Sequence, residues 1–530
     1  MQTETSRPRL SLAIISLVLF VTFLDNTIVA VALSNIQTDL HAGIQALQWV
    51  VSGYALTFAG LMLAFGTIGD RFGRRGMMGA GLVVFVAGSL IGSFASSVGM
   101  LIGARVIMGV GAAASEPGTL SMIRQLYPDR ADRARALGVW SAISGLALAA
   151  GPVIGGVLVG LWSWRLVFVF NIVIGVIALI GVRAVLPETT SESHSRLDER
   201  GFFWAAAAVT AAVFATILGE TDGYRTWWII LLYAAAVVAL VAFVVVERQA
   251  EEPALDLRFF RNGGFTSGMV IAFTGFFATF AVFFFIPLFI ELLGTTSPYQ
   301  LALDFAPMAI ALILASAWSG KWIARVGPTL PMTAGGLAAG AGIFITDAFI
   351  TPSSGLGLFG WSLAIVGAGL GVVMVGATAS VLSAVPSARS GMAASAVNTS
   401  RELGAVAGVT ILGAIVNAQL TTNLLQRLKA IPDLPPSMRN QVIVAVTTGN
   451  TSTGSLPKTP AITKIINEVI AAAEKSFSSG LDMVLILSAS LMIASGALAL
   501  LLGRRGATPA TEPELAPPRQ VERTGRDGRP

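Results

Sequence analysis

Long apolar runs recur along this chain from Leu10 to Leu502, and each ends in a short polar segment. A bilayer core of about 30 Å requires roughly 20 apolar residues for each helical crossing, and the runs reach this length. Of the 530 residues, 54% are hydrophobic and only 12% are charged, with a mean hydropathy of +0.76. A soluble protein of this length would expose far more charge. The sequence therefore predicts an all-α polytopic membrane protein.

The runs define fourteen predicted transmembrane spans. We place them at residues 10–33, 46–68, 77–95, 98–123, 134–160, 163–186, 200–219, 226–246, 264–291, 298–322, 329–350, 357–383, 391–416 and 480–502. A long outer loop is expected at 417–479, in which segment 462–473 forms either an amphipathic helix on the membrane surface or part of a solvated loop. The tail after the last span is rich in Pro, Arg and Glu, and we expect it to be disordered.

Basic residues set the predicted orientation, because short loops rich in Lys and Arg stay in the cytoplasm. If both termini are inside, sixteen basic residues lie in inner loops, whereas the short outer loops carry only Arg165 and Arg225. The sixteen are Arg71, Arg74, Arg75, Arg124, Arg130, Arg133, Arg135, Arg183, Arg196, Arg200, Arg248, Arg258, Arg261, Lys321, Arg325 and Arg389. The excess of arginine over lysine is typical of a GC-rich bacterial genome. We therefore expect a multi-pass protein of a bacterial cell membrane with both termini cytoplasmic.

Several functional classes lack the residues that they need. The chain contains no cysteine and only two histidines, His41 and His194, which are far apart in the sequence. We therefore expect no disulfide, no metal site and no cofactor. No HExxH motif or Walker A loop is present, which argues against a membrane enzyme and against an ATP-driven pump. The net charge of +5 is spread over membrane loops, so nucleic acid is not an expected partner. A sensor that transports nothing stays open.

The segment GTIGDRFGRRGMM, Gly66 to Met78, concentrates charge between two spans. Its glycines allow a tight reversal, while its arginines stay among lipid phosphates and water. Charge alone fits an ordinary cytoplasmic turn, but the spacing G-x-x-x-D-R-x-G-R-R resembles the loop signature of the major facilitator superfamily. The resemblance implies a gating loop, whose residues here are Gly66, Asp70, Arg71, Gly73 and Arg74.

A degenerate second copy of this loop lies at GKWIARVGPTLPM, residues 320–332. It keeps two of the glycines and one arginine as Gly320, Gly327 and Arg325, and Ala324 replaces the aspartate. Such pseudo-repeats are expected when two similar halves move around a central site. We therefore expect the major facilitator fold. Its predicted parts are a tail at 1–9, a six-helix half at 10–186, two inserted helices at 187–263, a second six-helix half at 264–502 and a tail at 503–530.

Four further motifs are similar to those of the 14-helix drug:proton antiporter family. They are FLDNTIVAVAL (23–33), LIGARVIMGVGAA (101–113), GLALAAGPVIGG (145–156) and WRLVFVFNIVIG (164–175). The third resembles the antiporter motif of the fifth helix, which supports the interface between the halves; static packing is the alternative. Its residues are Gly145, Gly151, Pro152, Gly155 and Gly156. The chain departs from the family at Met108, Glu116 and Glu402, where glutamine or a small residue is usual.

Asp25 lies in the middle of the first span with no charged neighbour in the sequence. A carboxylate at that depth costs roughly 2.5–3.5 kcal/mol on insertion scales, so it must face the protein interior. Arg105, at a similar depth in the fourth span, is the natural partner. Desolvation and an adjacent arginine act in opposite directions on such an acid, which makes it suited to proton coupling. The family resemblance gives Arg105 a part in proton transfer; a static structural pair is the alternative.

Three further acids lie in or near the spans: Glu116, Asp304 and Glu402, the last beside Arg401. Each either attracts a cationic substrate or belongs to a local ion pair. The phenylalanines at 283–285 either line an aromatic pocket or have an ordinary packing or lipid-facing role, which we favour.

Together these features predict an exporter of amphiphilic, often cationic, small molecules that is driven by the proton gradient. Its expected partners are substrates, protons and membrane lipids, and we expect the monomer to be functional. Export of a lipid or of a secondary metabolite made by the cell itself is the alternative.

Overall fold

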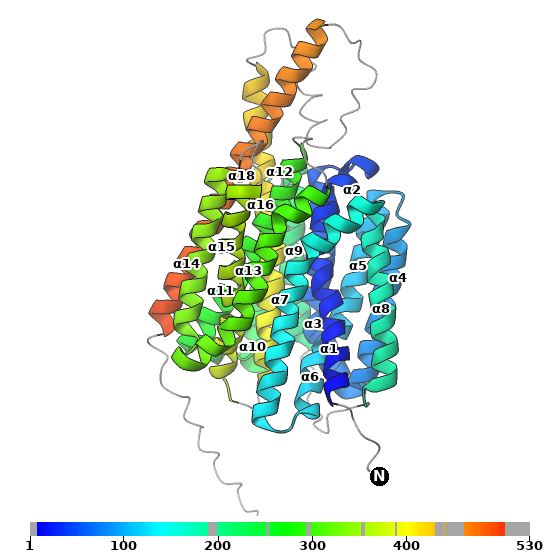
Figure 1. Cartoon of the computed structure of the whole chain (residues 1–530), viewed down its shortest axis with the longest axis vertical. Coiled ribbons are helices and arrows are strands. Elements are labelled where there is room, and N and C mark those ends of the chain that lie inside the picture. The colour runs from blue at the N-terminus through cyan, green and yellow to red at the C-terminus, as the bar shows by residue number, and fades with distance from the viewer. Residues whose placement is uncertain are drawn as a thin grey trace, which may run out of the picture.

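The computed structural model describes residues 8–188, 199–250, 255–292, 298–350, 356–386, 390–429 and 460–503, with the single positions 253 and 439. Across these residues the protein is all-α and contains no strand. Thirteen helices in this part are long and apolar enough to cross a membrane. The predicted span at 46–68 is a further helix, α3, of 29 residues. The helices stand side by side as one bundle, with two longer helices rising beyond it at one end (Figure 1).

The first half consists of eight α-helices and one 3₁₀ turn. They are α1 (Pro8–Ile28), η1 (Ala30–Ala32), α2 (Leu33–Leu40), α3 (Ile44–Phe72), α4 (Arg74–Ser93), α5 (Val98–Ser115), α6 (Pro117–Leu126), α7 (Arg130–Leu161) and α8 (Arg165–Val185). The predicted span at 10–33 thus ends in η1, with α2 following it, and the span at 98–123 is broken into α5 and α6. The break follows Glu116, because Pro117 lacks a backbone N–H and starts a new helix at its first position.

The second half begins with η2 (Leu257–Arg261) and α11 (Gly263–Phe280). It continues through η3 (Ala281–Phe285, a π-helix), α12 (Ile286–Leu292), α13 (Pro298–Val326), α14 (Thr329–Phe349), α15 (Leu356–Ser383), α16 (Ser390–Lys429) and α18 (Pro460–Gly503). The loop between α13 and α14 turns at Gly327, whose φ is +77°, as the loop between α3 and α4 turns at Gly73, with φ of +114°. Both copies of the predicted repeat therefore place glycine where an L side chain is strained.

Two helices lie between the halves in the sequence, α9 (Glu199–Asp222) and α10 (Trp227–Gln249). Helix α9 packs against α3 of the first half and α16 of the second, and α10 packs mainly on α9. Only 11% of the apolar window of α10 is buried inside the protein. Apart from the face that packs on α9, this helix therefore lies on the outer surface of the bundle.

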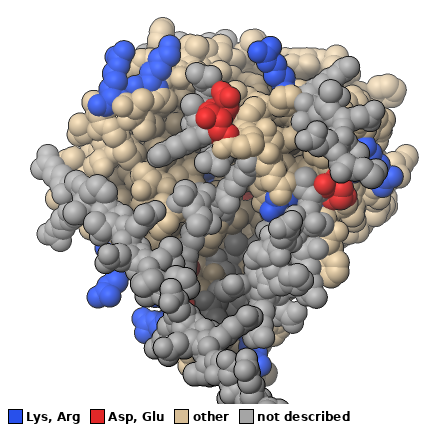
Figure 2. Space-filling model, turned by 90° about the horizontal axis from the view of Figure 1, so that it is seen from below, with Lys and Arg blue, Asp and Glu red and all other residues tan. Residues whose placement is uncertain are grey.

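The two halves meet along two seams. Helix α7 packs against α13, and α3 packs against α16. At the end far from Pro8, α2 also contacts α12 and η1 contacts η3. The opposite face, seen from below, carries Lys and Arg side chains around its rim (Figure 2). This basic face is the one that the sequence predicts to be cytoplasmic.

The outer loop predicted at 417–479 is wrong in its extent. Helix α16 continues to Lys429, and α18 begins at Pro460, so both ends of the predicted loop are helical (Figure 1). Segment 462–473 is neither a surface helix nor a solvated loop, because it is continuous with the last transmembrane helix. The error arose because polar residues end the apolar pattern, whereas the helical backbone continues outside the bilayer. The predicted tail at 503–530 and residues 1–7 lie outside the described residues, apart from Gly503.

Candidate functional site

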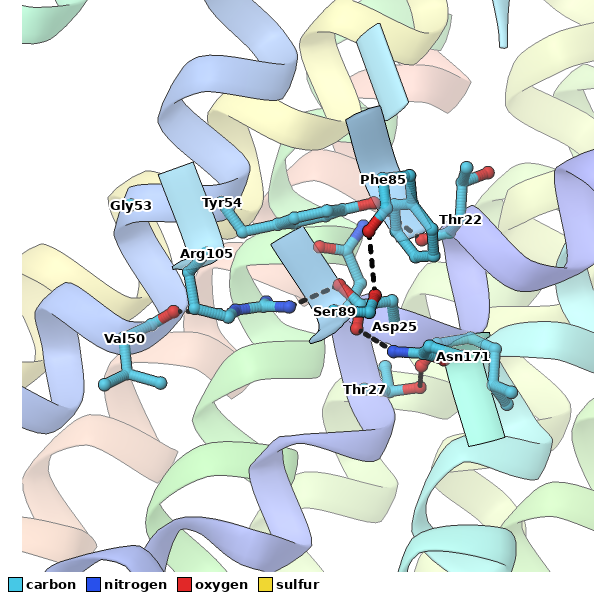
Figure 3. A network of polar contacts seen from close by, with 12 residues as sticks. Thr22, Asp25, Thr27, Val50, Gly53, Tyr54, Phe85, Ser89, Arg105 and Asn171 are labelled. Atoms are coloured by element: carbon cyan, nitrogen blue, oxygen red, sulfur yellow. Dashed lines mark hydrogen bonds and ion pairs between the residues drawn. The ribbon is translucent and has the colours of Figure 1, made fainter. Parts of the chain in front are cut away.

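Asp25 and Arg105 form a buried ion pair in the first half (Figure 3). Asp25 comes from α1 and Arg105 from α5, and both side chains are fully buried. Asn171 of α8 donates its Nδ2 to the second carboxylate oxygen at 2.6 Å. The carboxylate is thus held by donors from two other helices, which compensates for part of its desolvation cost. This is the partner that the sequence predicts for Asp25; its role in transport stays a prediction.

Arg105 is itself oriented by α3. Its Nε donates to the carbonyl of Val50 at 2.9 Å, and its guanidinium lies 4.4 Å from the ring centre of Tyr54. Tyr54 in turn donates its hydroxyl to the carbonyl of Thr22 in α1, at 2.9 Å. In the described part of the chain, Nη2 of Arg105 has no hydrogen-bond partner. The arginine therefore has a spare buried donor beside the carboxylate.

A second polar network joins the two halves at Glu116. This residue lies at the break between α5 and α6 and is only 1% exposed. Asn398 of α16 donates Nδ2 to its Oε1 at 2.9 Å, and Oε2 has no partner among the described residues. Arg401, one turn further along α16, donates to Oδ1 of Asn398 at 3.1 Å. The amide of Asn398 thus links Arg401 of the second half to Glu116 of the first.

Glu402 also bonds across the two halves, but here the acid belongs to the second half and the amide to the first. Asn26 of α1 donates Nδ2 to both carboxylate oxygens of Glu402, at 3.2 and 3.4 Å. Asn398 and Glu402 are four residues apart, so they lie on one face of α16, which is turned toward the first half. Asn26 directly follows Asp25 in α1, so the contact with Glu402 begins beside the ion pair. The ion pair and both contacts between halves therefore belong to one buried polar region.

Arg401 and Glu402, for which a local ion pair was one of two alternatives, form hydrogen bonds with different partners. Arg401 donates to the carbonyl of Met374 at 2.9 Å and to Oγ1 of Thr378 at 2.6 Å, both in α15. Glu402 instead meets Asn26. Consecutive residues of a helix point about 100° apart, so adjacent charges do not face each other.

Glu188, which the sequence analysis did not single out, contacts the gating loop. Arg75 donates its backbone N–H to Oε1 of Glu188 at 3.1 Å, and its side chain donates to the carbonyl of Leu186 at 3.3 Å. A Cβ at Gly73 would lie 2.7 Å from the same carboxylate oxygen. The positive φ of +114° favours glycine at 73, whereas the exposed Glu188 side chain can move away from a Cβ. Arg74 donates to the carbonyl of Ser121 at 3.5 Å.

Asp70 and Arg71 belong to helix α3, but their side chains lie outside the described residues. The predicted capping of another helix by Asp70 and its pairing with Arg74 therefore stay predictions. Gly66 faces α6, because a Cβ there would lie 3.3 Å from Cβ of Pro117.

The motif of the predicted fifth helix divides between two partners. Gly145 faces the second half, where a Cβ would lie 3.3 Å from Oγ of Ser316 in α13. Gly151 and Gly155 instead face α1, where a Cβ would overlap Thr27 and Ile28. Gly156 and Pro152 are buried in the same stretch of α7. Gly145, at the start of the motif, therefore lies at the interface between the halves, whereas Gly151 and Gly155 pack against α1.

Asp304 and the three phenylalanines lie apart from these networks. Asp304 is buried in α13 and accepts a hydrogen bond from Nε2 of Gln300, on its own helix, at 3.3 Å. The side chains at 283–285 are all buried in the π-helix η3, which fits the packing role that was favoured together with a lipid-facing one. The ring of Phe283 packs against that of Phe305, with centroids 5.6 Å apart. No group of three or more His, Asp or Glu side chains that could hold a metal occurs within the described ranges.

The asparagines of this region were not identified from the sequence. Asn26 and Asn171 lie inside the quoted motifs FLDNTIVAVAL and WRLVFVFNIVIG, and each is far along the chain from the acid to which it donates a hydrogen bond. An amide in a span costs less than a charge and gives a weaker signal in the hydropathy pattern. A search for amides at the depth of Asp25 would have found both.

Comparison with known proteins identifies relatives across nearly the whole chain. The Major Facilitator Superfamily model matches residues 15–409. The multidrug resistance protein Stp of Mycobacterium tuberculosis is 30% identical over 483 residues, which cover 90% of this chain and 89% of that protein. The drug efflux pump JefA of the same species is 30% identical over 512 residues, covering 96% and 100%. The tetracenomycin C resistance and export protein of Streptomyces glaucescens is 29% identical over 415 residues, covering 78% and 77%.

A solved structure has the same fold. It is the crystal structure of a bacterial homolog to the human lysosomal transporter Spinster, in an inward-facing and unoccupied conformation. The TM-score is 0.60 at 15% identity, and the alignment covers 94% of this chain and 99% of that one.

Proposed function

The chain belongs to the Major Facilitator Superfamily, and we propose that it is a multidrug efflux transporter that exchanges protons for amphiphilic small molecules. Relatives at about 30% identity are named as multidrug resistance proteins and drug efflux pumps, which supports export of drug-like compounds. Substrates are expected to include organic cations, since the buried polar region contains three acids: Asp25, Glu116 and Glu402.

The observation that carries proton coupling is the buried triad of Asp25, Arg105 and Asn171. A carboxylate held by an arginine and an amide is stabilised in its ionised form, and protonation removes the attraction between Asp25 and Arg105. Arg105 can then form a hydrogen bond to another acceptor through Nη2, which has no partner among the described residues. Proton binding at Asp25 therefore changes the arrangement of α1, α5 and α8 relative to one another.

Export against a gradient requires that proton and substrate compete for one carrier. In the proposed cycle, an ionised Asp25 favours the form that binds a cationic substrate. A proton from outside neutralises the acid and weakens that binding, and the substrate leaves. Reopening toward the cytoplasm returns the proton. Such coupling is reciprocal, so substrate binding also releases protons.

Two hydrogen-bonded contacts between the halves would form and break during this cycle. Asn398 with Glu116, and Asn26 with Glu402, connect the two halves only while these acids lie opposite the amides. A rocking movement of the halves must break both contacts. Glu116 and Glu402 are therefore the second candidates for proton binding. We expect no cofactor and no enzymatic activity, and we place both termini in the cytoplasm of a bacterial cell, with the monomer as the working unit.

A second candidate function is export of a secondary metabolite or lipid made by the cell itself. The observation in its favour is the likeness to proteins named for resistance to a single antibiotic, tetracenomycin C or methylenomycin A. Both functions use the same fold and the same coupling.

The test is transport by the purified protein in sealed vesicles. A panel of amphiphilic cations and neutral compounds is offered with an imposed pH gradient, with and without a protonophore. We expect gradient-driven accumulation of several unrelated compounds that the protonophore abolishes. Transport of one compound alone would favour the second function, and an absence of pH-driven flux for the whole panel would contradict both.

A further inference from the structure

A second polar cluster lies where helix α9 meets both halves, away from the Asp25–Arg105 pair. Its members are Gln48 of α3, Glu220 of α9 and Asn417 of α16. Asn417 donates Nδ2 to Oε2 of Glu220 at 2.9 Å, which bonds α9 to the second half. Helix α9 also packs along α3 of the first half. Neither the proposed transport cycle nor the sequence motifs assign a role to this cluster.

The contact between Glu220 and Asn417 is one half of the hydrogen-bonded pair that an acid and an amide can form. In that pair the amide N–H donates to one carboxyl oxygen, and the acid O–H donates to the amide oxygen. The atoms of the second bond, Oε1 of Glu220 and Oδ1 of Asn417, are both buried and have no partner among the described residues. Two acceptors cannot bond to each other while the acid is ionised. A proton on Oε1 supplies the missing donor.

Gln48 connects the cluster to the first half. Its side chain is fully buried, and a Cβ at Gly413 of α16 would overlap its Nε2. Asn417 lies one turn beyond Gly413 on the same face of α16. Gln48 also lies beside the carboxyl of Glu220, but neither atom of its amide forms a hydrogen bond of normal geometry in the described part of the chain. Polar groups of three helices therefore meet here with hydrogen-bonding capacity that is not satisfied.

The helix turns around the cluster carry no charge that could compensate an ionised Glu220. Residues 44–53 of α3 and 409–420 of α16 include no Asp, Glu, Lys or Arg. On α9 and its turn to α10, the charged neighbours Asp222 and Arg225 are exposed. A proton, rather than an ion pair, is therefore what neutralises the acid in this arrangement.

Two tyrosines are the other titratable groups near Glu220, and both are engaged with Thr216 of α9. Tyr224 donates its hydroxyl to the carbonyl of Thr216 at 3.2 Å. The hydroxyl of Tyr233 in α10 lies 3.0 Å from Oγ1 of the same residue. Neither hydroxyl therefore supplies the donor that Oε1 of Glu220 lacks.

The cluster lies at the end of the bundle that carries α2, away from the N-terminus (Figure 1). Glu220 is in the last turn of α9, and Gln48 is in the second turn of α3, which follows α2. At this end η1 contacts η3 and α2 contacts α12, so the two halves touch here in this structure. Because the basic face at the other end is predicted to be cytoplasmic, the half-buried Glu220 lies on the outer side, within reach of protons from outside.

We propose that Glu220 is a second proton-binding site, and that its protonated form allows α9 to hold the outer ends of the two halves together. This proposal rests on the movement of the halves in the proposed transport cycle. The protonated acid donates Oε1–H to Oδ1 of Asn417 and still accepts from its Nδ2 through Oε2. Loss of the proton leaves both oxygens buried without donors, which favours separation of α9 from α16 and entry of water. An acidic exterior therefore favours a closed outer side and the return of the carrier toward the cytoplasm.

The absence of cysteine allows spin labels to be placed at two chosen positions. Thr38 of α2 and Ala348 in the last turn of α14 are exposed, lie in different halves and are replaced by cysteine. The distance between the labels is measured by double electron–electron resonance in lipid nanodiscs at mildly acidic and mildly alkaline pH. The protein also carries Asp25→Asn, so that the coupling site proposed above adds no pH dependence. The ratio of closed to open outer ends should be at least about fivefold higher at acidic pH, the equivalent of about 1 kcal/mol for one hydrogen bond.

Variants of the acid–amide pair assign this pH response. In Glu220→Gln the new amide supplies the second hydrogen bond at every pH, so the outer ends should stay closed and the response should disappear. Glu220→Gln combined with Asn417→Asp moves the acid to α16 and keeps one acid opposite one amide, so the response should return. Asp222→Asn, which removes an exposed acid from the same end of α9, is the matched control and should respond as the background protein does. Elution profiles show whether each variant is folded.

A pH response of unchanged size in Glu220→Gln would overturn the proposal, and so would an exchanged pair that does not respond. Oxygen atoms also bind hard cations, so NaCl is replaced by choline chloride at constant pH and ionic strength. Closure that depends on sodium would make the cluster a metal site and would likewise overturn the proposal. Export of the compound panel is measured separately, so a missing pH response in a protein that exports drugs would overturn this proposal alone.

Discussion

Thr27 of α1 donates its hydroxyl to the carbonyl oxygen of Leu148 in α7, at 3.0 Å. That carbonyl lies four residues before Pro152, which has no backbone N–H to donate to it. The proline thus frees an acceptor inside the membrane, and a side chain of the neighbouring helix satisfies it. Gly151 allows the close approach, because a Cβ there would overlap Thr27. The helix 5 motif therefore fastens α7 to the helix that carries Asp25.

This relationship predicts that the stability effect of Thr27→Val depends on Pro152. Interhelical hydrogen bonds in membranes average about 0.6 kcal/mol, and the loss should be of this size in the parent protein. In the Pro152→Ala background, the new N–H at 152 bonds to Leu148, so Thr27→Val should cost clearly less. Unfolding of the four proteins of this cycle in detergent measures the difference. An equal loss in both backgrounds would show that Thr27 contributes only by packing.

Because Gly145 contacts α13, we expect a large side chain at 145 to block transport while the protein still folds. A leucine at 145 would meet Oγ of Ser316 and Cδ2 of Leu312, which lie 3.3 and 3.4 Å from the position of a Cβ. Gly145→Leu should therefore separate α7 from α13 and lower the transport rate at least about tenfold, if the strain reaches about 1.4 kcal/mol. Gly103→Leu is the matched control, because nothing lies within 4 Å of a Cβ there. Unchanged transport in Gly145→Leu would show that transport does not require α7 and α13 to move against each other.

The triad predicts that Asp25→Asn uncouples transport from protons. The amide keeps an oxygen that accepts from Arg105, so the protein should still fold and bind some substrate. Substrate-induced proton release and the pH dependence of binding should both disappear, because the titrating group is gone. Proton release is measured on purified protein in weak buffer. Glu188→Gln, which alters an exposed acid that contacts the gating loop, should release protons as the parent does.

Proton release of parental size from Asp25→Asn would move the coupling site. Glu116→Gln and Glu402→Gln would then be measured in the same way, since each acid is buried and bonded to an asparagine of the other half.

The gating loop predicts that Asp70→Asn slows transport while substrate affinity stays nearly unchanged. A negative charge at a helix N-terminus contributes about 0.3–1 kcal/mol, so the loss should affect the balance of two conformations rather than the fold. Transport rate and equilibrium binding of the same substrate are compared. If binding and thermal stability both collapse, Asp70 has a structural role only.

The basic face predicts that Phe72 and Ile470 lie on opposite sides of the membrane. Phe72 is 71% exposed at the end of α3, and Ile470 is 48% exposed in the outer part of α18. Single cysteines at these positions should react with an impermeant maleimide from opposite sides in intact cells. Labelling of both from the same side would rule out the orientation and the count of fourteen spans.

The sequence alone determined the class of fold, the number of apolar spans, the repeat and the pairing of Asp25 with Arg105. These follow from one strong physical constraint: backbone and charge cannot be left unsatisfied in lipid. Apolar length therefore identifies the spans, and a lone buried acid implies a buried cation. The full lengths of α16 and α18 could not be predicted in this way, because water outside the bilayer satisfies polar backbone groups and apolar length no longer marks a helix.

Only the tertiary structure decided which residues complete the site. Whether Arg401 meets Glu402 or Asn398 depends on the direction in which each side chain leaves α16, and on what lies opposite it in the other half. The asparagines that connect Glu116 and Glu402 to the opposite half have no signature of their own, because a buried amide is tolerated in many helices. Their roles come from two contacts of α16 with the other half, one with α1 and one with the break between α5 and α6. Only folding brings residues 26, 116, 398 and 402 together.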